Sequence, residues 1–239
     1  AGEKIQAVLP VHAFVDDRYV FFSTRQGVVK KTPLSDFANV RTNGIRAVEL
    51  DDGDGLVNVA LTDGSRDIML FGSHGKAVRF AEDEVRPMGR TARGVRGMRL
   101  PEDEADARVV AMLMVDGDGD ILTATARGFG KRTAVEEYPT KGRGTGGVIT
   151  LRLRPKDEIA SARVVRDTSL LTFITTGGTV MRCLAADISS LGRATQGVTI
   201  LNVGRTDHVA ALSVEEPDEE ERSQNVLISF NGDGDGVGA

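Results

Sequence analysis

Tryptophan is absent from this sequence, and cysteine occurs only once, at Cys183. A single cysteine excludes a disulfide within the chain and fits a reducing compartment. Aromatic residues make up only 5% of the chain, as nine phenylalanines and two tyrosines. So few aromatic side chains give no stacking platform for the bases of single-stranded nucleic acid.

Long hydrophobic runs are also missing. No apolar stretch approaches the roughly 20 residues that a membrane-spanning helix requires, and the first residues lack the basic-then-apolar pattern of a signal peptide. No segment sustains an apolar period of 3.6 residues, which an amphipathic helix would show. We therefore expect a cytoplasmic protein built from strands.

Motifs for catalysis or metal binding are not found. The sequence has no nucleophile elbow and no phosphate-binding Gly-Lys-Ser/Thr loop, and none of its three histidines stands at metal-ligand spacing from a cysteine or carboxylate. Asp116, Asp118 and Asp120 begin like a calcium loop, but Ile121 and Arg127 occupy positions that such a loop gives to glycine and glutamate. We expect no catalytic residue, no metal site and no small-molecule substrate.

A repeat dominates what is present. Gly44, Gly94, Gly147 and Gly197 each precede a β-branched residue and an alternating apolar pattern, at intervals of 50, 53 and 50 residues. These patterns predict strands over Ile45–Leu50, Val95–Leu100, Val148–Leu153 and Val198–Val203. A fixed period of about 50 residues is typical of repeat architectures.

An earlier glycine marks a hairpin in each repeat. Gly27, Gly75, Gly128 and Gly178 each separate two short apolar runs, as the turn of a β-hairpin would. Four residues after each glycine stands a basic side chain, namely Lys31, Arg79, Arg132 or Arg182.

A further strand opens each repeat, and a last one closes the series. These strands are predicted over Ile5–Val11, Leu56–Leu61, Arg108–Val115, Ile159–Val165 and Val209–Val214. Four-stranded units of this length predict an all-β, propeller-like fold. The predicted body spans 1–214, with repeats near 3–50, 51–103, 104–153 and 154–203 and a closing strand over 209–214.

The charge is unevenly distributed. Residues 215–239 carry eight acidic residues and one basic residue, so the rest of the chain holds 27 acidic and 29 basic residues. We expect 215–239 to form a disordered, acidic and glycine-rich tail that competes with a polyanion for the body. Val226–Phe230 resembles the first arm of a fifth hairpin or a short tail segment.

Basic residues recur in register. Arg41, Arg90, Arg143 and Arg193 stand three or four residues before the second glycine of each repeat, with Arg99 among the cations nearby. On a propeller-like body, such positions would line the rim and form a track for a phosphate backbone; the alternative is an ordinary solvated surface. The candidate DNA-binding residues are Lys30, Lys31, Arg41, Arg46, Arg79, Arg90, Arg93, Arg96, Lys131, Arg132, Lys141, Arg143, Arg182 and Arg193.

Four motifs carry a family resemblance. They are Val-Lys-Lys-Thr-Pro-Leu-Ser-Asp-Phe at 29–37, Val-Arg-Pro-Met-Gly-Arg at 85–90, Gly-Val-Arg-Gly-Met-Arg-Leu at 94–100 and Gly-Lys-Arg-Thr-Ala-Val-Glu-Glu-Tyr-Pro-Thr-Lys at 130–141. In this order they resemble the C-terminal domain of bacterial DNA gyrase A, over about residues 3–214.

The resemblance implies a β-pinwheel, in which propeller-like blades exchange strands with their neighbours. It also implies a non-catalytic domain that wraps duplex DNA around a basic perimeter, so that gyrase adds negative supercoils using ATP. The implied partners are duplex DNA, the rest of gyrase A and gyrase B in a heterotetramer on the bacterial chromosome. ATP and Mg²⁺ would be used elsewhere in the holoenzyme, with no cofactor and no membrane contact in this chain.

The sequence departs from the family pattern in two places. The family has six blades, whereas four repeats and a closing strand are found here. The family's glycine-rich box, Gln-Arg-Arg-Gly-Gly-Lys-Gly, is not found and is only echoed by 142–147. Two alternatives stay open: the equivalent domain of topoisomerase IV, and a protein-binding β-propeller scaffold.

Overall fold

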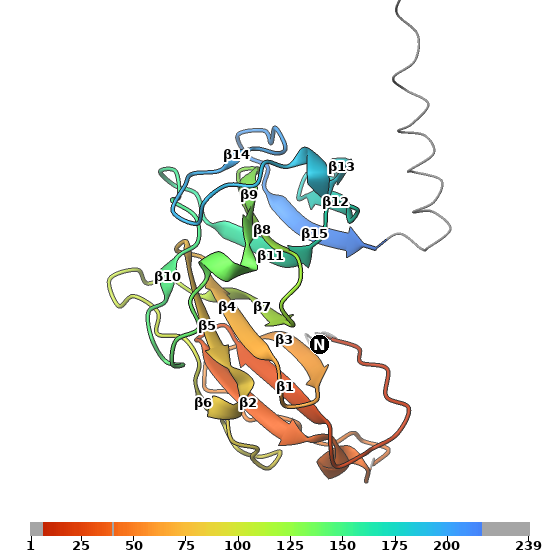
Figure 1. The fold of residues 1–239 in the computed structure, drawn as a ribbon. Helices are drawn as coiled ribbons and strands as arrows, with labels where there is room; N and C mark the ends of the chain where they lie inside the picture. The colour runs from red at the N-terminus through yellow and green to blue at the C-terminus, as the bar shows by residue number, and fades with distance from the viewer. Residues whose placement is uncertain (1–6, 40, 217–239) are drawn as a thin grey trace, which may run out of the picture.

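The structure, a computed structural model, describes residues 7–39 and 41–216. Its strands form three four-stranded antiparallel sheets and one three-stranded sheet, which we call blades 1 to 4 (Figure 1). The predicted all-β, propeller-like fold is thus confirmed. The predicted tail beyond Glu216, including Val226–Phe230, lies outside the described residues.

Each blade is centred on a hairpin whose turn contains the first glycine of a repeat. The hairpins are β1 (Tyr19–Thr24) with β2 (Val28–Pro33), β4 (Asp67–Gly72) with β5 (Lys76–Ala81), β8 (Asp120–Thr125) with β9 (Phe129–Ala134), and β12 (Leu170–Thr175) with β13 (Val180–Leu184). A 3-10 turn follows each hairpin: η1 (Leu34–Phe37), η2 (Glu82–Glu84), η3 (Val135–Glu137) and η4 (Ala185–Asp187).

The remaining strands of each blade come from the next repeat. On one side of the hairpins lie β3 (Leu56–Thr62), β7 (Val109–Val115), β11 (Ile159–Val165) and β15 (Val209–Glu215). On the other side of the first three lie β6 (Val95–Arg96), β10 (Val148–Ile149) and β14 (Val198–Thr199). The sheet orders are β3-β1-β2-β6, β10-β5-β4-β7, β11-β8-β9-β14 and β13-β12-β15.

This exchange means that the predicted repeat boundaries do not coincide with the sheets. The opening strand and the strand after the second glycine both pair with the preceding hairpin, not with the hairpin of their own repeat. No described hairpin precedes residue 19, so residues 45–50 form no strand although their pattern matches 95–100. Residues 7–11, the described part of the predicted first strand, are likewise irregular.

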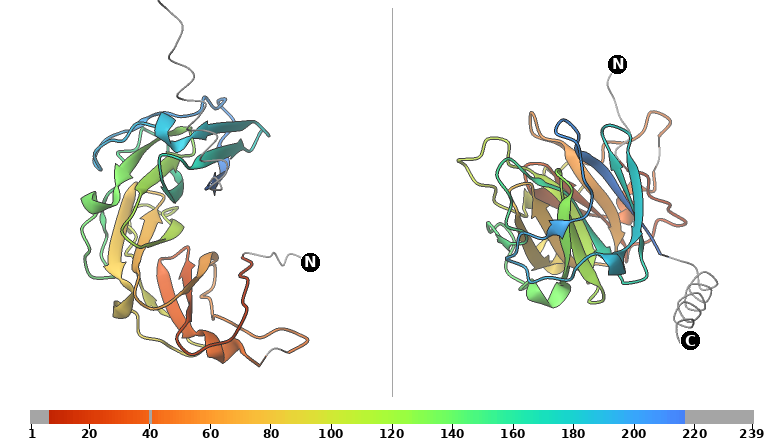
Figure 2. Two further views of the ribbon diagram at one scale, coloured as in Figure 1. Left: turned by 45° about the vertical axis from the view of Figure 1, so that its right-hand side comes forward. Right: turned by 90° about the horizontal axis from the view of Figure 1, so that it is seen from above.

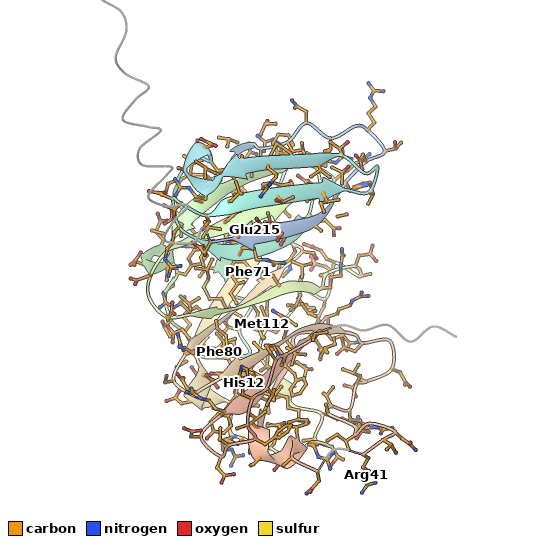
Figure 3. All side chains as sticks on the ribbon, turned by 90° about the vertical axis from the view of Figure 1, so that its right-hand side faces the viewer. His12, Arg41, Phe71, Phe80, Met112 and Glu215 are labelled. Atoms are coloured by element: carbon orange, nitrogen blue, oxygen red, sulfur yellow. The ribbon has the colours of Figure 1, made fainter. Side chains whose placement is uncertain are left out.

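The blades stack along an open arc, which Figure 2 shows in its left view. The strands β3, β7, β11 and β15 contact one another in sequence and form the inner side of the arc. The strands β6, β10 and β14 therefore lie on the outer side. In Figure 3, Arg41 lies beside blade 1 at the lower end of the stack, and Glu215 lies on β15 of blade 4 in its upper part.

Apolar side chains fill the space between neighbouring blades. Phe21 of blade 1 packs with Ile68, Leu70 and Phe80 of blade 2, and all four are fully buried. Two similar clusters join blade 2 to blade 3 and blade 3 to blade 4. The core is thus divided among the junctions, as nearest-neighbour stacking requires.

Glycine is needed at the hairpin turns because the next repeat closes onto them. Gly75 has φ +83°, and its carbonyl accepts hydrogen bonds from the amides of Thr150 and Leu151. A Cβ at Gly75 would lie 2.6 Å from the carbonyl oxygen of Leu151. Gly27 and Gly128 are clamped in the same way, whereas Gly178 has no such neighbour within 4 Å.

Candidate nucleic-acid interface

Three segments, which we call the outer loops, run along the outer side of the arc. They comprise residues 86–94, 139–147 and 189–197, and they lead from a 3-10 turn to β6, β10 and β14 respectively. Each begins by docking on the preceding blade, where the amides of Met88, Lys141 and Leu191 donate to the carbonyls of Lys31, Arg79 and Arg132. The four-strand repeat therefore places each loop at the same point of its blade.

Two arginines in the outer loops bind main-chain carbonyls of the preceding repeat. The Arg143 guanidinium donates to the carbonyls of Glu84 and Arg96, both at 3.1 Å. The Arg193 guanidinium donates to those of Glu137 at 3.1 Å and Ile149 at 2.6 Å. Both side chains are half-buried, so they hold successive loops together as well as adding positive charge.

Main-chain hydrogen bonds link the same loops in series. The amide of Arg99 donates to the carbonyl of Thr145 at 2.9 Å, and the amide of Arg152 donates to that of Thr195 at 2.8 Å. The strand that leaves one outer loop is thus bonded to the next outer loop. The result is a continuous edge instead of three independent loops.

Exposed cations without an acidic partner stand on or beside this edge. Arg96 and Lys141 are exposed and form no salt bridge with any described residue, and Arg90 is half-buried and likewise unpaired. Three exposed arginines beyond the predicted set join them: Arg86, Arg99 and Arg152. Arg99 and Arg152 stand five residues after Gly94 and Gly147, the second glycines of their repeats. This shared position in the repeat could have predicted them from the sequence.

The remaining exposed members of the predicted set are spread over both ends of the arc. Arg41 and Arg46 are exposed beside blade 1 and form no salt bridge with a described residue. Arg93 is paired with Asp51 at 2.9 Å and Glu49 at 3.6 Å. Arg182, on β13 of blade 4, is paired with Glu215 at 3.1 Å. Such exposed pairs are weak and remain open to exchange for another anion.

Lys31, Arg79 and Arg132, which stand four places after the first three hairpin glycines, do not lie on the outer surface, unlike the exposed Arg182. The side chain of Arg79 donates to Asp67 at 2.8 Å and to the carbonyls of Val135 and Tyr138 at the end of η3. Arg132, almost fully buried, donates to the carbonyl of Ile188 at 2.8 Å and is paired with Asp120 and Asp167.

Lys31 repeats this arrangement in blade 1, where its buried ammonium donates to the carbonyl of Glu82 at 3.2 Å. Lys31, Arg79 and Arg132 thus bind a 3-10 turn of the following repeat. Because these cations are enclosed and already bonded, their placement argues against the expected contact with phosphates. The recurrence of a basic residue at this position of every repeat predicted a function for Lys31, Arg79 and Arg132. It could not show whether these side chains are exposed or buried.

Lys30 and Lys131 are also buried, with side chains that end beneath the outer loops. The Lys30 ammonium donates to the carbonyls of Ala47 and Arg90. The Lys131 ammonium donates to those of Gly192 at 2.6 Å and Arg193 at 2.8 Å. The pKa of each lysine is lowered to about 8, chiefly by burial and in part by the nearby charge of Arg90 or Arg193. A direct contact between either lysine and a phosphate is therefore not supported by this geometry.

This interface provides positive charge but, among the described residues, no group suited to metal binding. Among the described residues, no group of histidine, cysteine, aspartate and glutamate could hold a metal ion. Tyr138 is buried against Thr150, with its hydroxyl 2.7 Å from that of Thr150, and burial raises its pKa to about 12. No helix in the described part of the chain is long and apolar enough to span a membrane.

The repeats match a known family model. The model is described as "DNA gyrase C-terminal domain, beta-propeller", and it matches residues 18–63, 66–116, 119–166 and 170–214. Each matched unit begins near the start of a hairpin and ends with the inner strand of the next repeat. Each unit therefore holds the hairpin and the inner strand of one sheet, whereas the outer strands β6, β10 and β14 come from the following unit.

Curated relatives are similar over almost the whole chain. The DNA gyrase A protein of Salmonella typhimurium is 45% identical over 223 residues, which are 92% of this chain and 25% of that protein. The gyrase A protein of Escherichia coli is 45% identical over 221 residues, with the same shares. The chain thus spans about a quarter of the length of these relatives.

Solved structures share the fold. The C-terminal domain of DNA topoisomerase IV matches with a TM-score of 0.83 and 27% identity, covering 94% of this chain and 70% of that one. A DNA gyrase A C-terminal domain matches with a TM-score of 0.74 and 22% identity, covering 85% of this chain and 68% of that one.

Proposed function

Because the chain belongs to the family of DNA gyrase C-terminal domains, we propose that it binds duplex DNA along its outer loops and bends the duplex to follow the arc. The observation that carries the proposal is the continuous outer edge. Three outer loops are hydrogen-bonded in series, and unpaired cations such as Arg96, Arg99 and Lys141 stand on it.

The physical requirements for wrapping are met by charge and curvature together. Bending 20–30 base pairs by 40–90° costs on the order of 1–6 kcal/mol. Cations that release counterions from successive phosphates can offset this cost, and their effect weakens as salt rises. The absence of tryptophan and the scarcity of other aromatic residues favour contacts to the backbone over readout of bases.

The same proposal gives the chain a non-catalytic role in a larger enzyme. Its partners are the remainder of gyrase A, together with gyrase B in a heterotetramer, which uses ATP and Mg²⁺ in other parts to introduce negative supercoils. A cytoplasmic location on the bacterial chromosome follows from that role. The chain itself supplies the curved surface that orders the duplex.

Charge reversal on the outer edge tests the proposal. The variant carries Arg96→Glu, Arg99→Glu and Lys141→Glu, and its matched control carries Lys156→Glu, Arg166→Glu and Arg205→Glu, which are exposed and lie outside the outer loops. Affinity for a linear duplex is measured at several salt concentrations. We expect the salt slope to fall by about 0.9 for each lost phosphate contact in the first variant, with a much smaller change in the control.

Equal losses in the two variants would contradict the proposal, because the effect would then follow net charge and not position. A chain whose affinity for duplex is weak and insensitive to salt would point instead to the protein-binding scaffold.

The topoisomerase IV match keeps a second function open, since its TM-score is 0.83. The two can be distinguished by the sign of the supercoils trapped on a relaxed plasmid. We expect the chain to trap positive supercoils, as a gyrase-type wrap requires. Binding without trapped supercoils would favour the topoisomerase IV alternative.

A further inference from the structure

Two buried lysines stand at one position of the repeat, where the other blades have apolar residues. Pairing across the hairpins makes Lys30, Val78, Lys131 and Met181 equivalent. Lys30 is 1% exposed and Lys131 is 0% exposed. Burying an ammonium is unfavourable unless it gains compensating contacts, and methionine or valine fills the position elsewhere. Packing alone therefore does not explain the two lysines.

Four of the five hydrogen bonds from the two ammonium groups go to main-chain carbonyls, and three of these carbonyls lie in the outer loops. Lys30 binds the carbonyl of Arg90 in loop 86–94 and that of Ala47, and Lys131 binds those of Gly192 and Arg193 in loop 189–197. The remaining bond, from Lys131 to the Thr133 hydroxyl, is 3.0 Å long. Neither ammonium forms a salt bridge with a described carboxylate.

The charged groups that face the lysines are few. Asp36 and Arg90 act on Lys30, and the ring of Phe22 lies 5.7 Å from its ammonium. Glu137 and Arg193 act on Lys131.

The middle outer loop differs from the other two in one main-chain hydrogen bond. Loop 139–147 lies above Val78, and the amide of Gly144 donates to the carbonyl of Gly97 at 2.6 Å. No equivalent bond is formed by the other two outer loops within the described chain. A lysine is thus present beneath each loop that lacks this bond and absent beneath the loop that has it.

We propose that Lys30 and Lys131 are positioning residues for DNA: each buried ammonium holds the main chain of one outer loop so that the cations of that loop stay on the outer edge. This inference rests on the proposed function for its consequence, but the loop anchoring can be tested without DNA.

The test uses Lys30→Met, Lys131→Met and, as a matched control, Val78→Met in the 239-residue chain. Methionine already occupies the position in blade 4, as Met181. Amide hydrogen exchange is measured in the free chain. We expect exchange in loop 86–94 to rise by about tenfold in Lys30→Met and in loop 189–197 by about tenfold in Lys131→Met, because hydrogen bonds to a charged group are lost. Val78→Met should leave both loops unchanged.

Binding of a linear duplex then separates positioning from direct contact. A double-mutant cycle combines Lys30→Met with Arg90→Ala, which removes the guanidinium but keeps the carbonyl. If Lys30 acts through its loop, the two losses of affinity are not additive. Additive losses would show that Lys30 contacts the phosphate itself and would overturn the positioning role.

Unchanged exchange in both lysine variants would also overturn the proposal, whatever happens to DNA binding. Increased exchange in a chain that does not bind duplex would leave the anchoring intact and remove the proposed function instead. If a methionine variant does not fold, the proposal is tested by hydrogen exchange of the unsubstituted chain at several pH values. Its loops should lose protection as the pH rises through about 8, after correction for the intrinsic exchange rate.

Discussion

Equivalent glycines face different surroundings within and at the end of the arc. Gly75 and Gly178 have φ values of +83° and +85° in equivalent hairpin turns. A Cβ at Gly75 would meet the carbonyl of Leu151, whereas no atom of residues 7–39 and 41–216 lies within 4 Å of a Cβ at Gly178. Comparing substitutions at the two glycines therefore separates the effect of close packing between blades from the effect of the left-handed backbone conformation.

We therefore expect Gly75→Ala to be more destabilising than Gly178→Ala. A left-handed conformation costs a non-glycine residue about 1–2 kcal/mol in either turn. The collision with Leu151 should add about 2 kcal/mol or more at position 75 only. Denaturant unfolding of both variants measures the difference, and equal losses would mean that the junction yields without strain.

The buried lysines predict how stability depends on pH. The pKa of Lys30 and Lys131 is lowered from 10.5 to about 8 in the folded chain. Between these values the unfolded chain binds more protons, so the free energy of unfolding should rise with pH. The penalty for burying two charges is present below pH 8 and is relieved above it.

This prediction is measured by denaturant unfolding at about pH 7.5 and about pH 9.5, on either side of the folded-state pKa. The unsubstituted chain should gain stability relative to the Lys30→Met, Lys131→Met double variant over this interval. If the free energy of unfolding changed with pH in the same way in both proteins, titratable groups other than Lys30 and Lys131 would be responsible.

At the scale of elements, one basic residue in each of the first three hairpins ties its blade to the next 3-10 turn. Arg132 on β9 holds the carbonyl of Ile188 and the carboxylate of Asp120. Arg182 on β13 occupies the equivalent position but is exposed, and its guanidinium is paired with Glu215 alone among the described residues.

Arg132→Met should therefore destabilise the chain by about 2 kcal/mol or more, because it leaves the buried carbonyl of Ile188 and the partly buried carboxylate of Asp120 without their donor. Arg182→Met should change stability by less than about 1 kcal/mol, as exposed ion pairs do. Thermal unfolding of the pair of variants supplies the comparison. Similar decreases in unfolding temperature for the two variants would imply that Arg132 does not stabilise the junction between its blade and the next.

The elements also show how far sequence patterns reach. The hairpins were predictable because Gly27 and its equivalents stand between apolar runs, and the basic residue four places later marked their register. The pairing partners were not predictable, since the spacing of strands does not reveal which sheet each one enters. Residues 45–50 and 95–100 share one pattern, yet only the second segment meets a preceding hairpin.

The candidate site was predictable in part for a related reason. Arg96 and Lys141 are exposed on the outer edge as expected. Lys30, Lys31, Lys131 and Arg132 are buried, and their sequence context gives no sign of it, because lysine and arginine are usually exposed. Burial here depends on loops that arrive from the next repeat.

For the whole molecule, charge balance predicts an effect of the acidic tail. Residues 217–239 contain six acidic residues and one basic residue. Removing them should raise the affinity for duplex at low salt, because fewer negative charges then compete with phosphate. The gain should shrink at high salt, where the competition is screened.

A truncated chain ending at Glu216 tests this expectation in the same salt titration as the full chain. A matched tail in which the acidic residues are replaced by glutamine separates charge from length. If all three proteins bound duplex DNA with equal affinity, the tail would have no effect on binding.

The open arc is assembled from one junction used three times, in which a turn glycine accepts two amides from the following repeat. Any repeat that keeps this junction can extend the arc by one blade without disturbing the blades already in place. The length of polymer held against such an arc would then increase in equal steps. Gain or loss of a single unit of about 50 residues would therefore change that length by one fixed increment, leaving the chemistry of the contact surface unaltered.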